Sequence, residues 1–402
     1  MTYHLFEVTG VELEYMIVDA ETLDVSPIAD QLIHKVCGQY ASDVDRGSIS
    51  WSNELARHVI ELKTTVPTTS LTNLHDAFYQ QVHDINRHLC SLNALLLPTA
   101  MHPWMIPDEE FQVWPHDYNE TYEAFNEIFD CRGHGWSNLQ SMHLNLPFAN
   151  DHEFARLHAA IRLVLPILPA IAASSPFMEG NSTEFLDNRL EVYRTNARRI
   201  PQVTGDVIPE PVYSHADYET QILQPLYQAI SPLDTDDILQ HEWLNARGAI
   251  ARFERNAIEI RVLDIQECPK ADLGIAQLVV ALLKQLASVD QHTFEQQKAF
   301  PTERLAAIFR QAIRTADRTV IDDVEYLRLF GIRGTELSAS ELWHNLLQTL
   351  KPQSTWSNEE ERTIRQMVDR GCLARQLLNS SHHLVRTYRK LAECLDQNSL
   401  YA

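Results

Sequence analysis

The stretch Gly10-Val11-Glu12-Leu13-Glu14-Tyr15 sets two acidic side chains in alternation with apolar ones. Such alternation predicts a β-strand, because successive side chains of a strand point to opposite faces of its sheet. We expect this strand within residues 3–20. Its apolar residues then pack on one face, and Glu12 and Glu14 project together from the other.

Three later segments show a similar pattern. They are Glu54 to Lys63, His143-Leu144-Asn145 and Glu259-Ile260-Arg261. Strand parity puts His143 on one face with Asn145, and Glu259 on one face with Arg261. Glu54 and Glu61 are seven residues apart and cannot share a face of one regular strand, so we predict a bend or bulge between them.

Carboxylates gathered on one face of a sheet repel one another and resist desolvation unless a cation lies between them. Because the candidate ligands are mainly hard oxygen atoms, the pattern favours Mg²⁺ or Mn²⁺ over zinc. Together the four segments predict the lining of one metal and nucleotide site.

Composition narrows the class of protein. The chain has 402 residues, of which 45% are hydrophobic and 22% are charged, so neither a disordered chain nor a membrane protein is indicated. Its longest apolar run, 163–173, is too short to span a bilayer and contains Pro166 and Pro169. The net charge of −22 disfavours a nucleic-acid partner, because the phosphate backbone requires a basic face.

The cysteines and the first residues of the sequence indicate the cellular compartment. The six cysteines are scattered, with no C-x-x-C, which predicts reduced thiols in a cytosolic protein. The start, Met1-Thr2-Tyr3-His4, shows no basic region followed by an apolar one, so no signal peptide is visible. We therefore expect a cytoplasmic protein.

The spacing of apolar residues predicts the remaining elements. Residues 59–65, 95–99 and 249–264 are expected to be strands, and 179–219, rich in Gly and Pro, a mobile loop on the substrate side. The expected helices are 29–36, 71–95, 122–129, 154–172 (kinked at its prolines), 271–289, 302–314, 341–350, 359–378 and 382–395. Ser338 with Glu341, and Ser357 with Glu360, form capping boxes.

This order of elements predicts an α+β fold. A central antiparallel or mixed sheet would have helices toward one side, followed by a helical C-terminal third. We expect a catalytic unit over residues 1–290 and a helical region over 291–402 packed on it. The apolar stripes of the C-terminal helices would suit a homodimer.

The order of these motifs resembles the glutamate-cysteine ligase family of the second type, also called the carboxylate-amine ligase family. Its G-x-E-x-E strand is similar to residues 10–14, and its second acidic strand to 53–62. Its T-H-P-[FW] turn resembles 101–104, its histidine strand 142–145, its S-P-[FY]-M-x-G turn 175–180 and its E-[VI]-R-x-x-D strand 259–264. The resemblance runs from about residue 8 to residue 290.

The resemblance implies a glutamine-synthetase-like sheet, ATP, two or three Mg²⁺ ions, and small carboxylate and amine substrates joined as an amide through an acyl phosphate. It implies six metal ligands, namely Glu12, Glu14, Glu54, Glu61, His143 and Glu259. Arg261, with Glu61, would act in catalysis, stabilising the transferring phosphoryl group. Arg189 and Asn145 would contact substrate. Residues 181–199 follow the family pattern poorly, so the substrates themselves are not implied.

Two other functions remain open. One is a phosphotransferase on the same kind of sheet, which would release a stable phosphorylated acceptor. The other is a non-catalytic homologue that binds a metabolite, in which Glu12→Gln would change neither nucleotide binding nor any activity.

Overall fold

A computed structural model describes residues 2–380 and 383–402. Its centre is an eight-stranded sheet in the order β2-β3-β4-β1-β6-β10-β9, with β5 paired to β1, and every one of these pairings is antiparallel. The strands are β1 (Gly10–Asp19), β2 (Asp43–Asp45), β3 (Ile49–Asn53), β4 (Val59–Thr64), β5 (Ala94–Leu97), β6 (Ser141–Pro147), β9 (Ala249–Arg252) and β10 (Ala257–Asp264). The α+β prediction is thus confirmed, with an antiparallel sheet.

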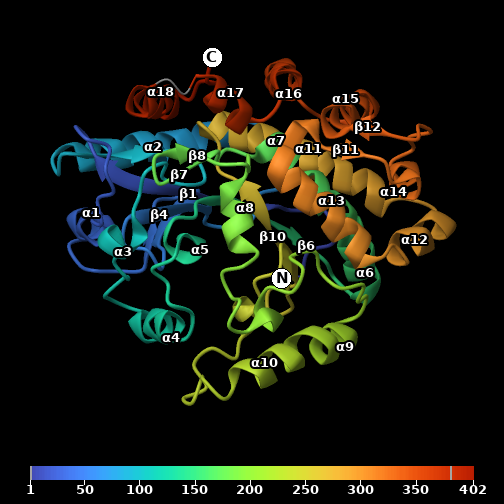
Figure 1. The fold of residues 1–402 in the computed structure, drawn as a ribbon, viewed down its shortest axis with the longest axis horizontal. Helices are drawn as coiled ribbons and strands as arrows, with labels where there is room; N and C mark the ends of the chain where they lie inside the picture. The colour runs from blue at the N-terminus through green and yellow to red at the C-terminus, as the bar shows by residue number, and fades with distance from the viewer. Residues whose placement is uncertain (1, 381–382) are drawn as a thin grey trace.

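Helices cover the apolar face of this sheet. Helices α2 (Leu74–Cys90) and α11 (Pro269–Ala287) pack against each other, and in Figure 1 they lie along its upper side. Tyr15 of β1 is fully buried, and its hydroxyl donates a hydrogen bond to Asp272 of α11 (3.4 Å). The apolar side chains of β1 therefore belong to the main core, as their alternation predicts.

The C-terminal third is helical. It comprises α12 (Gln291–Lys298), α13 (Thr302–Thr315), α14 (Val324–Leu329), α15 (Ala339–Leu350), α16 (Asn358–Arg370), α17 (Leu373–Asn379) and α18 (Leu384–Gln397). Helices α15 and α16 pack on α11, and α18 packs on α2 and β5 (Figure 1). Both predicted capping boxes are present, at the starts of α15 and α16.

Two predicted helices differ from the structure: the one expected over 71–95 ends at Cys90, and a later one is divided. The helix expected over 359–378 is divided into α16 and α17 at Gly371, whose φ of 75° is favoured only for glycine. The last helix begins at Leu384, and its expected first residue, His382, lies outside the described residues.

Prolines divide the buried segment after β6 as expected. Helix α6 (Asp151–Val164) is followed by a 3₁₀ turn (Leu165–Ile167) and α7 (Pro169–Ala172). By contrast, the single strand expected over 249–264 is a hairpin of β9 and β10, and a turn through residues 253–256 reverses the chain.

The segment 179–219 is not one open loop. It contains the short strand β8 (Asn181–Ser182) and the helices α8 (Asn188–Tyr193) and α9 (His215–Tyr218). Asp187 caps α8 by accepting a hydrogen bond from the backbone N–H of Leu190 (2.9 Å), and most of α8 is buried. A helix this short has too few turns to show periodicity in the sequence.

Among the residues that the structure describes, no single helix has both the length and the apolarity to span a membrane, although α11 and α12, bent by 114° at their junction, meet that test as a pair.

Candidate active site

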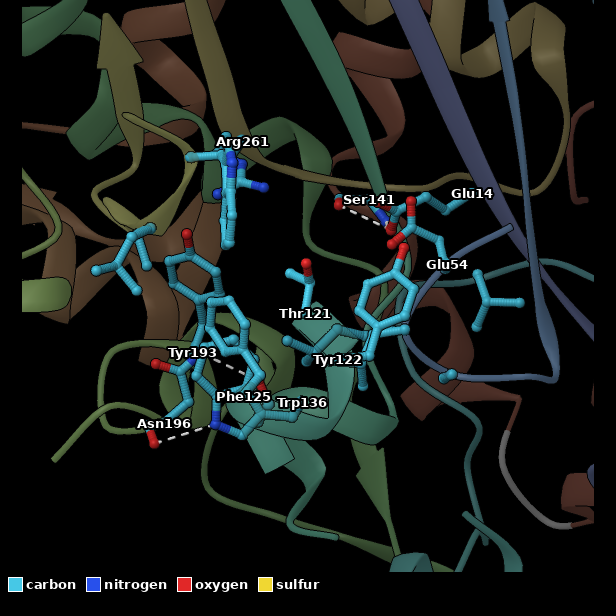
Figure 2. Close-up of a pocket in the computed structure, with 18 of the residues that line it drawn as sticks. Glu14, Glu54, Thr121, Tyr122, Phe125, Trp136, Ser141, Tyr193, Asn196 and Arg261 are labelled. Atoms are coloured by element: carbon cyan, nitrogen blue, oxygen red, sulfur yellow. Dashed lines mark hydrogen bonds between the residues drawn. The ribbon is translucent and has the colours of Figure 1, made fainter. Parts of the chain in front are cut away.

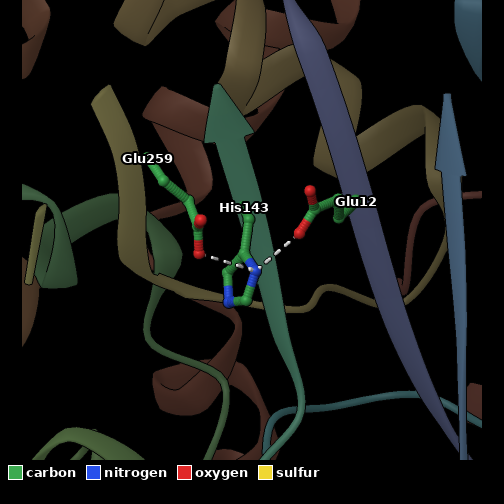
Figure 3. Close-up of side chains that lie close together, drawn as sticks. All are labelled: Glu12, His143 and Glu259. Carbon is green, nitrogen blue, oxygen red and sulfur yellow. Dashed lines mark hydrogen bonds and ion pairs between the residues drawn. The ribbon is translucent and has the colours of Figure 1, made fainter. Parts of the chain in front are cut away.

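His143 lies at the centre of a cluster of carboxylates on the polar face of the sheet. Its Nδ1 is 2.9 Å from Oε2 of Glu12 and 3.7 Å from Oε1 of Glu259 (Figure 3). Its Nε2 is 2.9 Å from the hydroxyl of Ser141 and 3.7 Å from Oε1 of Glu14. One imidazole therefore lies between carboxylates from two flanking strands.

Strand register explains this convergence. Glu12 of β1 pairs with His143 of β6, and Glu259 of β10 pairs with Asn145, one same-face step along β6. On the other side of β1, Glu14 pairs with Glu61 of β4. Antiparallel partners on one face have Cβ atoms about 4.5–5.5 Å apart, so neighbouring strands bring these side chains together.

Two sets of three side chains have the geometry of a cation site. Glu12, His143 and Glu259 form one, and Glu14, Glu61 and His143 form the other. Within each set the ligand atoms lie within 4.8 Å of one another. Mostly oxygen ligands with one imidazole suit Mg²⁺ or Mn²⁺.

Two carboxyl groups of this cluster, Glu61 and Glu54, are only partly compensated by the protein, although Lys63 Nζ lies 3.4 Å from Oε2 of Glu61. Burial and the charges of Glu12 and Glu54 raise the pKa of Glu61 well above its usual value, although Ser52 donates a hydrogen bond to it (2.5 Å). Burial and the charge of Glu14 raise the pKa of Glu54 to about 8. Cations would stabilise the ionised forms of these groups, so the residues present fit a divalent metal.

Glu12 and His143 behave as an ion pair. Burial would raise the pKa of Glu12, but the hydrogen bond and charge of His143 lower it to about 2. Burial would lower the pKa of His143, but the hydrogen bond to Glu12 and the charge of Glu14 raise it to about 9. A bound metal would take the place of the imidazole proton, because a metal ligand must be neutral imidazole.

Glu54 reaches the cluster from a turn. Strand β3 ends at Asn53, and residues 54–58 lead into β4, so Glu54 and Glu61 lie on different elements of a hairpin. The predicted bend is present, and β3 itself was not expected as a strand. Figure 2 shows Glu54 beside Glu14 at one side of a cavity of about 570 Å³.

Arg261 lies at the opposite side of this cavity in Figure 2. Its Nε is 2.9 Å from Oε1 of Glu259, so the shared face predicted for these two residues brings them into an ion pair. Burial would lower the pKa of the guanidinium, but the charge of Glu259 raises it further above its ordinary value. Arg261 therefore offers a fixed positive charge to the cavity.

Arg189 also borders the cavity, from α8. Its Nε donates to Asp264 (2.5 Å) and its Nη1 donates to the backbone carbonyl of Arg261 (3.2 Å). Its Nη2 is buried and has no hydrogen-bond partner among the described residues. Of the three guanidinium nitrogens of Arg189, only Nη2 thus lacks a partner among the described residues.

The side chain of Asn145, predicted to contact substrate, points at Glu12. Its side-chain amide donates to Oε1 of Glu12 (3.0 Å). In this position it orients a candidate metal ligand.

The cavity also has an aromatic side that no pattern in the sequence predicted. It includes Tyr122 and Phe125 of α4 (Asn119–Phe129), Trp136 of α5 (His134–Ser137), Tyr193, and Trp243 of the 3₁₀ turn Glu242–Leu244. On α4 the lining residues recur three and four positions apart, as on one face of a helix. The helix predicted from the sequence began only at residue 122 and was too short to show this spacing.

Comparisons with known proteins show which family the chain resembles. The sequence profile of glutamate-cysteine ligase family 2 (GCS2) matches residues 8–390. An uncharacterized protein from Archaeoglobus fulgidus is 31% identical over 401 residues, which cover 98% of this chain and 99% of that protein.

Relatives described as putative glutamate–cysteine ligase 2 are more distant. The one from Chloroflexus aggregans is 24% identical over 92% of this chain and 86% of its own length. The one from Paracoccus denitrificans is 26% identical over 69% of this chain, which spans 66% of that protein.

Among solved structures, the glutamate–cysteine ligase of Francisella tularensis, determined in complex with AMP, superposes with a TM-score of 0.60 at 13% identity. The match covers 98% of this chain and 90% of that one, and it shows a shared fold. With the profile match over most of its length and the whole-chain Archaeoglobus fulgidus relative, the chain belongs to glutamate-cysteine ligase family 2.

Proposed function

We propose that this protein is an ATP- and Mg²⁺-dependent carboxylate-amine ligase, which joins a small carboxylic acid, such as the γ-carboxylate of glutamate, to a small amine. One observation carries the proposal. Four carboxylates and a histidine from β1, β4, β6 and β10 converge beside a cavity that Arg261 also lines. The AMP bound to the structurally similar ligase supports an adenine nucleotide as the phosphoryl donor.

The residue types suit phosphoryl transfer. This chemistry depends on positioning and on neutralising the charge of phosphate oxygens, and it needs no protein nucleophile. Glu12, Glu14, Glu61, His143 and Glu259 would hold the cations, which supply charge neutralisation to the phosphates when bound. The charge of Arg261, held by Glu259, would stabilise the negative charge that develops on the transferred group.

The reaction proceeds in two displacements. A carboxylate oxygen of the acid attacks the γ-phosphorus of ATP, the bond to the bridging oxygen breaks, and ADP leaves. The amine nitrogen then attacks the acyl carbon, the carbon–oxygen bond to phosphate breaks, and the nitrogen loses a proton. The partly enclosed cavity limits hydrolysis of the acyl phosphate by water.

A screen of acids and amines for ADP release tests the proposal. ADP and phosphate should accumulate only when a matching acid and amine are both present, and mass spectrometry should show their amide. Glu12→Gln should abolish turnover, whereas Glu109→Gln, at an exposed carboxylate of α3 (Pro107–Glu110), should not.

Three outcomes would contradict the proposal. A stable phosphorylated acceptor would identify a phosphotransferase. A protein that binds a metabolite but shows no ADP release with any acid and amine pair would indicate a non-catalytic homologue. Absence of Mg·ATP binding by calorimetry would exclude both nucleotide-dependent activities.

A further inference from the structure

Three aromatic residues form a continuous apolar surface on one side of the cavity. They are Phe125, Trp136 and Trp243, named here the aromatic wall. The ring centroids of Phe125 and Trp136 are 5.4 Å apart, and those of Phe125 and Trp243 are 5.6 Å apart. Phe125 is only 8% exposed and lies between the two tryptophans. Phe125 therefore packs against both tryptophans, and the three rings form one surface.

The aromatic wall begins next to the carboxylates. Tyr122 and Phe125 lie three positions apart on α4 and face the same cavity (Figure 2). The hydroxyl of Tyr122 accepts a hydrogen bond from Asn53 Nδ2 (3.2 Å), and Asn53 directly precedes Glu54. Tyr122 therefore lies between the wall and the acidic side of the site.

The polar groups at the Trp136 end of the aromatic wall are already paired. The indole N–H of Trp136 donates to the backbone carbonyl of Asn196 (3.2 Å), and the side-chain amide of Asn196 donates to the carbonyl of Gly135 (3.1 Å). A purine buried there would have ring nitrogens and an exocyclic amine that need partners, and an unpaired buried polar group is unfavourable. This end of the wall is better matched to a ring without polar edges.

On these grounds, and resting on the ligase function proposed above, we propose that the aromatic wall binds an aromatic or bulky apolar side chain of the acceptor amine. The amine nitrogen would point away from the wall, toward the part of the cavity lined by Glu14, His143 and Arg261, where the acyl phosphate would form. A ring of this kind offers a large, flat apolar area that packs against other rings. A small thiol-bearing side chain would leave most of the wall uncovered.

Binding of two amines that differ by one phenyl group tests the inference without turnover. Calorimetry on the full chain with Mg²⁺ would compare phenethylamine with ethylamine, and a separate titration would use the non-hydrolysable nucleotide AMP-PNP. Phenethylamine should bind at least tenfold more tightly than ethylamine. Equal affinity of the two amines would overturn the inference.

Variants test whether the preference for phenethylamine depends on the aromatic wall. Phe125→Ala should remove the preference for phenethylamine and leave AMP-PNP affinity within twofold. If that variant does not fold, Thr121→Trp, which adds bulk to the lining of the cavity, should remove the preference in the same way. Phe129→Leu is the matched control, because Phe129 belongs to the same helix and contacts Phe125 and Trp136 from the core side. It should retain the preference.

The outcomes separate this inference from the ligase proposal. A tenfold loss of AMP-PNP affinity in Phe125→Ala, with the amine preference retained, would make the wall the nucleotide base site and overturn the inference alone. A ligase that uses ethylamine as efficiently as phenethylamine would also overturn it alone. A protein that prefers phenethylamine but never releases ADP would overturn the ligase proposal and support the wall as a ring-binding surface.

Discussion

Glu14 on β1 lies directly opposite Glu61 on β4 in the antiparallel register. Both side chains are buried, and they share His143 as a third neighbour. Like charges placed opposite each other destabilise a sheet, and burial increases the repulsion. A bound cation would relieve this repulsion, and its effect on stability can be measured in the absence of substrate.

Mg²⁺ or Mn²⁺ should raise the thermal stability of the protein, because a cation that binds only the folded state stabilises it. The expected gain is about 2.7 kcal/mol at a hundredfold excess over Kd. Glu61→Gln should match or exceed the wild type in chelator, since it removes a buried carboxyl, but should gain little from metal. Differential scanning fluorimetry in chelator and in metal measures both. An equal metal response of Glu61→Gln and wild type would count against Glu61 as a ligand.

Strand alternation was sufficient to predict the sheet face and its polar residues. Glu12, Glu14, His143 and Glu259 occupy same-face positions on strands that the structure pairs directly. The sequence could not show the turn after Asn53, because Glu54 interrupts no periodic pattern and β3 is short and buried on both faces. The bend was predicted only because Glu54 and Glu61 are seven residues apart in the sequence.

The aromatic side of the cavity was not predicted because its residues come from separate segments. Trp136 and Trp243 lie on short turns of helix, and each is an isolated aromatic in the sequence. Only the tertiary fold places them against Phe125. The ion pair of Arg189 with Asp264 could not be predicted either, because the two residues are far apart in the sequence and Asp264 belongs to a strand.

Stability should fall at mildly acidic pH because of His58. This side chain is fully buried, neither ring nitrogen has a partner among the described residues, and burial with the nearby His102 lowers its pKa to about 3. The unfolded state has a pKa of about 6.5. Between these values the unfolded state binds the additional proton, so stability rises with pH and is lost as pH falls below about 6.5.

His58→Leu tests this dependence. Between pH values of about 3 and 6.5, the unfolding free energy of the variant should fall less steeply with decreasing pH than that of the wild type. The difference in slope should be as much as about 1.4 kcal/mol per pH unit. Urea unfolding at about pH 6.5 and about pH 5 measures the difference. An identical pH dependence in wild type and variant would show that His58 is not the group that titrates.

Asp264 should be essential for stability because it pairs with the buried Arg189. It accepts hydrogen bonds from Arg189 Nε (2.5 Å), Ser174 N (2.8 Å) and Ser175 Oγ (3.0 Å). Asp264→Asn removes the closest counter-ion of the buried guanidinium and leaves only the carboxyl of Asp187 nearby, which should destabilise the fold by about 3–5 kcal/mol. Urea denaturation measures the change.

An exposed ion pair provides the control for Asp264. Glu184 and Arg314 form a salt bridge in which both side chains are more than half exposed. Glu184→Gln should change stability by less than about 0.5 kcal/mol, because solvent screens such pairs. If the two variants were equally destabilised, burial would not be the cause.

Arg261 should matter for the rate more than for binding. Its guanidinium lines the cavity and is held by Glu259, so Arg261→Gln should lower kcat about 10²–10³-fold and change the KM for ATP by only a few fold. Arg252 is the matched control, because it also reaches Glu259 (3.4 Å) but, among the described residues, does not line the cavity. Arg252→Gln should retain most of the rate of ADP release. Equal losses in the two variants would mean that both arginines act only by holding Glu259, and that Arg261 does not touch the transferred phosphoryl group.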